Sequence, residues 1–168
     1  MKKKLHVLRW LALTVFVCSG LTVNAQELRV GALAALPAGD ASDVSSFNAA
    51  VDASLYFIKI NENLSLGATT GYSRFFGKTE TVDGLDIDYD DFSFIPIAAS
   101  GRGLFGKHLV YVADIGYAAG LDDVGGGLFY QAKFGWTNTK IDAFLIYNGI
   151  SAKESDITVL GLGVSFKI

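Results

Sequence analysis

Eight amphipathic segments follow one another along the chain, and the connections between them are alternately long and short. Within each segment apolar side chains alternate with polar or small ones, which is the period of a β-strand with two unlike faces. Connections after the odd-numbered segments are long, whereas those after the even-numbered segments are tight turns. This pattern predicts an antiparallel sheet with two unlike ends, formed by residues 28–36, 47–60, 64–76, 92–103, 109–118, 128–136, 140–148 and 158–168.

A leader precedes these segments. A basic start with three lysines at 2–4, an apolar run at 11–18 and the small-residue pattern Val23-Asn24-Ala25 predict a signal peptide over residues 1–25, cleaved before Gln26. Lipid attachment at Cys18 is the alternative. The predicted mature chain, residues 26–168, forms one domain and has no cysteine for a disulfide. It keeps ten basic and 17 acidic residues, and a net charge of about −7 disfavours nucleic acid as a partner.

The strand lengths and the loop pattern select the architecture. Strands of about 9–11 residues can cross a bilayer, where every backbone group must be paired, so the sheet has to close on itself. Short turns on the periplasmic side and long loops outside are typical of outer-membrane barrels. The sequence therefore predicts an all-β fold, a closed eight-stranded antiparallel up-and-down transmembrane β-barrel.

One face of each strand is free of charge in its middle and is predicted to meet lipid. Aromatic residues gather near strand ends, as in the girdles of membrane barrels. The phase of the fourth strand, 92–103, stays open, because both of its faces are apolar and Pro96 removes a ladder donor. The predicted girdle comprises Phe57, Trp136, Tyr147 and Phe166, with Phe75, Phe76, Phe92 and Phe105 as further members.

Charged residues fall on the opposite face, inside the predicted barrel. Eight strands leave an interior that side chains can fill. Buried charges must be paired to be tolerated, so a structural polar network is expected, with a proton or ion path as the alternative. Its predicted members are Asp52, Arg102, Asp114, Lys133, Asp142 and Lys167.

In this pattern the chain resembles the small bacterial outer-membrane β-barrel proteins of the OmpX, OmpA-transmembrane-domain and OmpW-like kind. The most specific element is the last strand, Thr158 to Ile168, whose alternating apolar residues look like the assembly signal of that family. The resemblance implies a monomer in the outer membrane of a Gram-negative bacterium. It also implies contact with outer-membrane lipid and lipopolysaccharide, and recognition of the last strand by the barrel-assembly machinery.

Two sequence features are candidates for a metal site or a catalytic residue. The connection 77–91 contains Asp86-x-Asp88-x-Asp90, which suggests either a Ca²⁺ site or, as the favoured interpretation, an extended hairpin arm with one acidic face. His108, the single histidine of the mature chain, falls in a predicted short turn without a partner for nucleophilic catalysis. No catalytic residue, metal site or cofactor is predicted, and the chain is not expected to be an enzyme.

Three functions remain open at this point. The leading one is a membrane barrel with a side-chain-filled polar lumen that has a structural role or presents its loops for adhesion or recognition. The second is a narrow channel or transporter for small or hydrophobic solutes. The third is a soluble secreted barrel that binds an apolar ligand as lipocalins do, which would require an apolar interior.

Overall fold

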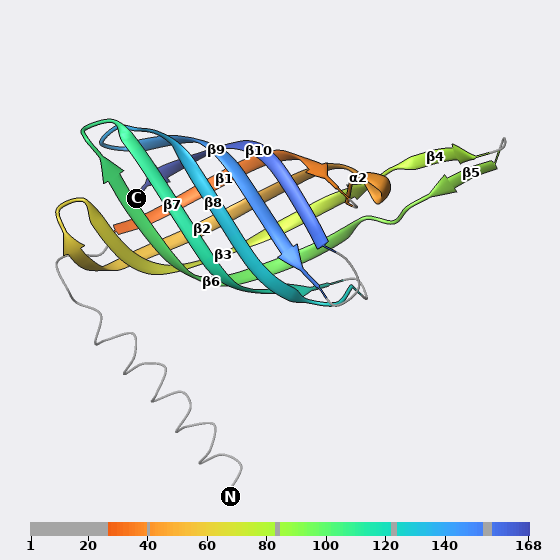
Figure 1. Ribbon diagram of the computed structural model, residues 1–168, viewed down its shortest axis with the longest axis horizontal. Coiled ribbons are helices and arrows are strands. Elements are labelled where there is room, and N and C mark those ends of the chain that lie inside the picture. Colours follow the sequence, from red (N-terminus) through yellow and green to blue (C-terminus); the bar gives the residue numbers. More distant parts are fainter. Residues whose placement is uncertain (1–26, 40, 83–84, 122–123, 153–155) are drawn as a thin grey trace, which may run out of the picture.

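The chain forms a closed eight-stranded antiparallel barrel, as predicted (Figure 1). The computed structural model describes residues 27–39, 41–82, 85–121, 124–152 and 156–168, so the predicted signal peptide lies outside the described residues. Each strand pairs with its sequence neighbour in the barrel, and the first strand pairs with the last. The barrel strands are β1 (Glu27–Ala38), β2 (Ser45–Asn61), β3 (Leu64–Gly77), β6 (Phe92–Phe105), β7 (Leu109–Gly120), β8 (Gly127–Thr137), β9 (Ile141–Ser151) and β10 (Asp156–Lys167).

The short turns join the strands at one end of the barrel, which we call the inner end. Asn61 and Asn138 shape two of these turns, because their side-chain oxygens accept hydrogen bonds from the backbone N–H of Asn63 (2.8 Å) and of Lys140 (2.8 Å). In the third turn Gly106 has a φ of 67°, a conformation that favours glycine. These residues explain why the connections after β2, β6 and β8 are tight.

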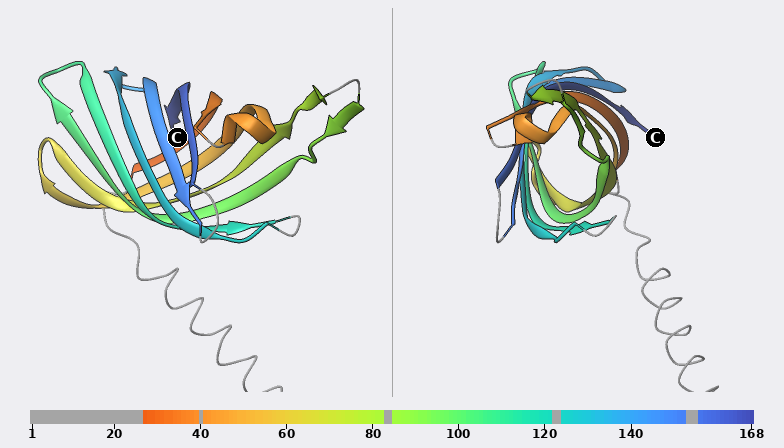
Figure 2. Two further views of the ribbon diagram at one scale, coloured as in Figure 1. Left: turned by 45° about the vertical axis from the view of Figure 1, so that its right-hand side comes forward. Right: turned by 90° about the vertical axis from the view of Figure 1, so that its right-hand side faces the viewer.

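The longest connection leaves the opposite, outer end as a projecting arm. Strands β4 (Thr79–Val82) and β5 (Leu85–Asp88) pair with each other and continue the course of β3 and β6 beyond the barrel (Figure 2). The predicted extended hairpin arm is therefore confirmed. The connection over residues 37–46, predicted as a loop, differs from expectation, since it contains the short helix α2 (Ala41–Val44), whose Ala41 is buried.

The phase of β6, open in the sequence, is fixed by the core. Phe94, Ala98 and Arg102 are buried inside, whereas Ile95 and Ile97 are exposed outside. Backbone pairing between β3 and β6 lapses beside Pro96 and resumes in the same register at Ser73. The proline thus interrupts the ladder without a bulge, as expected for a residue that lacks an N–H.

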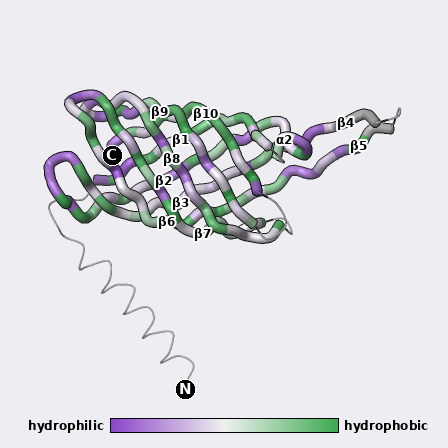
Figure 3. The backbone as a smooth tube through the Cα atoms, viewed as in Figure 1, coloured by the Kyte–Doolittle hydropathy of each residue, from purple (hydrophilic) through white to green (hydrophobic). Residues whose placement is uncertain are grey.

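Hydrophobic and hydrophilic residues alternate along the barrel strands (Figure 3), and many of the large apolar side chains are exposed on the outer wall. Leu162, Ile97 and Ile115 are 67%, 65% and 62% exposed, although each lies within a strand. A water-soluble protein rarely exposes such a large apolar area, whereas a barrel in a bilayer requires it. Among the described residues, no helix is long and apolar enough to cross a membrane. The apolar wall therefore argues against the lipocalin-like alternative and for a transmembrane barrel.

Candidate functional site

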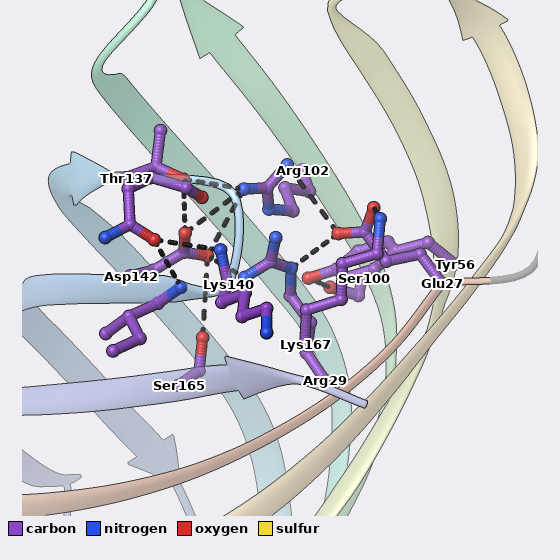
Figure 4. Close-up of polar contacts among 12 residues, drawn as sticks. Glu27, Arg29, Tyr56, Ser100, Arg102, Thr137, Lys140, Asp142, Ser165 and Lys167 are labelled. Atoms are coloured by element: carbon purple, nitrogen blue, oxygen red, sulfur yellow. Dashed lines mark hydrogen bonds and ion pairs between the residues drawn. The ribbon is translucent and has the colours of Figure 1, made fainter.

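The centre of the inner half of the lumen is the carboxylate of Asp142, which is fully buried. It accepts hydrogen bonds from Arg29 Nη1 at 2.8 Å and from Arg102 Nη2 at 3.2 Å. The hydroxyl groups of Thr137 and Ser165 also donate to it (Figure 4). The negative charge of Asp142 is thus shared between two guanidinium groups. Each of these buried charges is tolerated only because the others compensate it.

Glu27 and Lys167 extend this cluster toward the inner rim. Glu27 pairs with Arg29, and its second oxygen accepts a hydrogen bond from Lys167 Nζ at 2.9 Å. The Lys167 side chain is 45% exposed, so it lies at the rim of the barrel. The sequence placed Lys167 in the lumen, whereas the structure puts it at the mouth, because it is the last residue of β10.

A second cluster of polar side chains lies deeper in the barrel. Lys133 donates a hydrogen bond to Asp52, and Gln131 Nε2 donates to Asp114 at 3.0 Å. Gly31 faces this group: a Cβ there would collide with the Asp52 carboxylate. The glycine therefore leaves the space that the carboxylate occupies beside β1.

Side chains close the lumen at this level. The cavity between Arg29, Asp52 and Asp142 measures about 10 Å³, roughly the room for one water molecule. Within the described part of the chain, some buried polar atoms have no hydrogen-bond partner: Asp114 Oδ1, Gln131 Oε1, Asn48 Oδ1 and Arg102 Nε. Polar side chains therefore fill the described lumen at this level and leave a cavity of only about 10 Å³ between them.

The structure brings five of the six predicted lumen residues into the interior: Asp52, Arg102, Asp114, Lys133 and Asp142. Sequence reasoning did not assign Glu27 and Arg29, which complete the Asp142 cluster. The sequence does hold a signal, because the apolar residues Leu28 and Val30 alternate with Glu27 and Arg29 and suit the lipid-facing side of the first strand. Strict alternation would then have put Glu27 and Arg29 inside.

The outer half of the lumen is mainly apolar. Phe75 and Phe92 stack with ring centroids 4.8 Å apart, and Phe94 meets Phe75 edge-on at 6.0 Å. Phe75 is only 1% exposed. Its assignment to the lipid-facing girdle was wrong, as it lies on the inner face of β3, and half-buried Phe92 also belongs to this interior cluster.

Four predicted girdle residues, Phe57, Trp136, Tyr147 and Phe166, lie on the lipid-facing side of their strands. Phe57, Trp136 and Phe166 are exposed near the inner ends of β2, β8 and β10. Tyr147 lies toward the outer end of β9, where its ring is 6.2 Å from that of Tyr130. Such positions suit the two interfaces of a bilayer, where amphipathic rings are favoured.

The outer end differs from the inner end in charge. The long connections, residues 39–44, 78–91, 121–126 and 152–155, contain eleven of the 17 Asp and Glu residues and two Lys residues. At the base of the arm, Arg74 Nη2 donates to Asp91 Oδ2 at 2.8 Å, and the Gly77 N–H donates to Asp91 Oδ1 at 2.9 Å. These hydrogen bonds, that from Arg74 first, lower the pKa of Asp91.

The described residues contain no group of three or more His, Cys, Asp or Glu side chains close enough to hold a metal ion. Asp88, from the proposed Ca²⁺ motif, instead accepts a hydrogen bond from Thr79 across the β4–β5 pair at 2.6 Å. The side chain of Asp86 lies outside the described part, so the Ca²⁺ alternative stays a prediction. His108 lies in the β6–β7 turn, and its ring stacks on that of Trp136 at 6.1 Å.

Comparison with known proteins gives the class of fold. No protein-family model matches the chain, and neither does any curated protein sequence. Solved structures do match. The outer membrane protein Ail of Yersinia pestis in a phospholipid nanodisc is 13% identical, with a TM-score of 0.59, over 84% of this chain and 99% of that one. The crystal structure of Ail is 10% identical, with a TM-score of 0.59, over 85% and 97% of the two chains.

A designed protein also matches: a de novo transmembrane β-barrel is 10% identical, with a TM-score of 0.53, over 84% of this chain and 95% of that one. Identities this low report the fold alone. Together with the closed sheet and the apolar wall, they define the class: the chain has the fold of a small integral outer-membrane β-barrel. The predicted architecture is confirmed, and the predicted outer-membrane location agrees with that of Ail.

Proposed function

We propose that the protein is a non-catalytic outer-membrane barrel whose outer loops recognise a macromolecular partner, with the β4–β5 arm as the principal contact. The observation that carries this proposal is the arm itself. Within the described residues, β4 and β5 pair only with each other, so each strand keeps one unpaired edge outside the barrel. An extended segment of a partner can add to such an edge through backbone hydrogen bonds.

The base of the arm supports this role, since it is attached to the barrel mouth. The Lys78 N–H donates to the carbonyl of Val44 in α2 at 3.2 Å, and the Tyr89 N–H donates to the carbonyl of Lys78 at 3.1 Å. The Tyr89–Lys78 hydrogen bond joins the two sides of the arm, and the Arg74–Asp91 pair is a second attachment of the arm to the barrel. An arm fixed in direction loses less conformational entropy on binding than a free loop would.

Charge selects the kind of partner. The excess of acidic residues in the outer connections favours a basic surface and disfavours polyanions. Ail has been solved with the heparin analogue sucrose octasulfate, which is strongly anionic. For this chain we propose the opposite preference, a basic protein surface, because sulfate groups would meet mainly carboxylates here.

We propose supporting roles for the other features of the barrel. We propose that the apolar wall contacts outer-membrane lipid and lipopolysaccharide, that β10 is the strand recognised by the assembly machinery, and that the barrel acts as a monomer. The polar network in the lumen is proposed to be structural. The channel alternative has less support, because the lumen narrows to a cavity of about 10 Å³ between the charged side chains.

Adhesion of proteoliposomes tests the proposal. Vesicles that contain the folded protein should bind to a surface coated with the basic protein lysozyme more strongly than to serum albumin or heparin. Replacing residues 79–88 with a short Gly-Ser turn should abolish the difference, and binding should weaken as salt rises, because exposed charges are screened. The unaltered protein and the variant without the arm should both still show a compact gel band that shifts on boiling. Equal adhesion without the arm would refute the proposal.

Conductance separates this function from transport. Planar bilayers that contain the folded protein should stay at leak level, since the charged side chains fill the inner lumen. Discrete conductance steps would instead favour the channel alternative.

A further inference from the structure

A cavity of about 320 Å³ opens at the outer end of the barrel, beside the base of the arm. We call it the outer vestibule. Residues from four separate parts of the chain line it: α2, the segment between β5 and β6 together with the first residue of β6, the β7–β8 connection and the start of β10. Its volume falls in the range of small-molecule sites and is many times that of the cavity in the polar network.

The walls of the outer vestibule are mainly apolar. Val44, Val124 and Ile157 contribute aliphatic surface, and Tyr89 and Phe92 contribute aromatic rings. Phe92 stacks on the buried Phe75, so this ring is held by the core beneath it. Apolar walls on a rigid floor favour the organic body of a ligand and would not replace the water shell of a metal ion.

Two carboxylates, Asp90 and Asp156, also line the outer vestibule. Both are exposed, and among the described residues neither is paired with a basic side chain. Ser151 Oγ donates to Asp156 Oδ1 at 2.6 Å and so orients this carboxylate. The two acids reach the cavity from different elements, which gives an otherwise apolar site a negative side.

We propose that the outer vestibule binds an organic ammonium ion, a cation whose charge is carried on an apolar or aromatic body. The carboxylates would attract the ammonium group, the rings of Tyr89 and Phe92 would contact it or its substituents, and the aliphatic wall would take the body. The acidic outer connections would raise the local concentration of such cations. This site does not depend on the arm's binding of a macromolecule.

The probe is benzyltrimethylammonium, with benzyl alcohol and benzenesulfonate as neutral and anionic counterparts. Titration of the full barrel in uncharged phosphatidylcholine nanodiscs, followed by methyl NMR, should show saturable shifts at Val44, Val124 and Ile157. An eleven-atom ligand of this kind is expected to bind in the millimolar range. The anion should cause no shift, and the neutral probe should bind more weakly than the cation.

Variants separate charge from cavity. Asp90→Asn with Asp156→Asn should weaken cation binding by about tenfold, which corresponds to about 1.4 kcal/mol. Asp43→Asn is the matched control, because this exposed residue of α2 carries the same charge at the same end without lining the outer vestibule. Val44→Trp should abolish binding of both the cation and the neutral probe by filling the cavity.

Three results would overturn the proposal: no saturable shift at these methyl groups, equal affinity for benzyl alcohol, or an equal loss of affinity in Asp43→Asn. Each variant must first show the compact, heat-modifiable band of the closed barrel. If a variant fails this check, the probe series on the unaltered protein still decides, because charge preference and the location of the shifts need no substitution.

Discussion

The inner and outer halves of the lumen contain different kinds of side chain. In the inner half, Asp142 forms ion pairs with Arg29 and Arg102, and Lys133 forms an ion pair with Asp52. In the outer half, the rings of Phe75 and Phe94 pack edge-on in a mainly apolar cluster. The inner half is stable only as a balanced set of charges, whereas the outer half depends on filled volume. One lumen thus shows how the same strand pattern supports two kinds of core.

The largest expected effect is in the charged half. Asp142→Asn keeps the shape of the side chain but leaves Arg29 and Arg102 buried without this counter-charge. Removal of one partner from a buried ion pair costs about 3–5 kcal/mol, so the free energy of unfolding should fall by about 4 kcal/mol. Urea titration in lipid vesicles measures it.

Asp88→Asn is the control for this substitution, since it makes the same chemical change on an exposed residue of the arm. It should leave the free energy of unfolding of the barrel nearly unchanged. A similar loss in both variants would show that net charge, rather than the buried cluster, sets the stability.

A smaller loss is expected in the apolar half. Phe94→Ala removes a fully buried ring and leaves a cavity, which should lower the free energy of unfolding by about 3 kcal/mol. Since no charge is exposed, this loss should be the same at low and high salt, unlike effects that depend on ion pairs. A salt-dependent loss would contradict the division of the lumen into two kinds of core.

The Lys133–Asp52 pair sharpens the comparison through a double-mutant cycle. Lys133→Met alone leaves Asp52 and the neighbouring Asp114 without this cation and should cost about 2 kcal/mol. Adding Asp52→Asn should restore part of the loss, because one of the two uncompensated charges is then gone. Strictly additive losses, measured by the same urea titration, would mean that the two residues do not interact.

The smallest effect concerns the base of the arm. Because hydrogen bonds from Arg74 and Gly77 lower the pKa of Asp91 in the folded protein, the stabilisation is present above the ordinary carboxyl pKa. It is lost as the pH falls through the lowered pKa. Hydrogen exchange of the Gly77 amide, corrected for intrinsic rates, should therefore lose protection in acid. In Asp91→Asn this protection should not depend on pH in that range.

The sequence predicted the barrel well because each strand has one buried and one lipid-facing side, so strict alternation determines the phase. It left β6 open, because Phe92 to Ile97 is apolar at nearly every position, and only packing against Phe75 selects the inner face. It predicted five of the interior charged residues but missed Glu27 and Arg29, and it could not pair them, since Arg29 and Asp142 lie 113 residues apart. It also missed helix α2, because Ala41–Val44 is too short to show a helical period.

The Asp142 cluster makes neutralisation of charge depend on closure of the sheet. Its partners Arg29 and Ser165 belong to β1 and β10, the first and last barrel strands, which meet only when the ring of strands is complete. In a sheet open at this seam, Asp142 would lack Arg29 as its counter-charge, in a setting that tolerates lone charges poorly. Closure of the sheet between β1 and β10 thus supplies the counter-charge that a buried carboxylate needs, which favours the complete ring of eight strands over a sheet left open there.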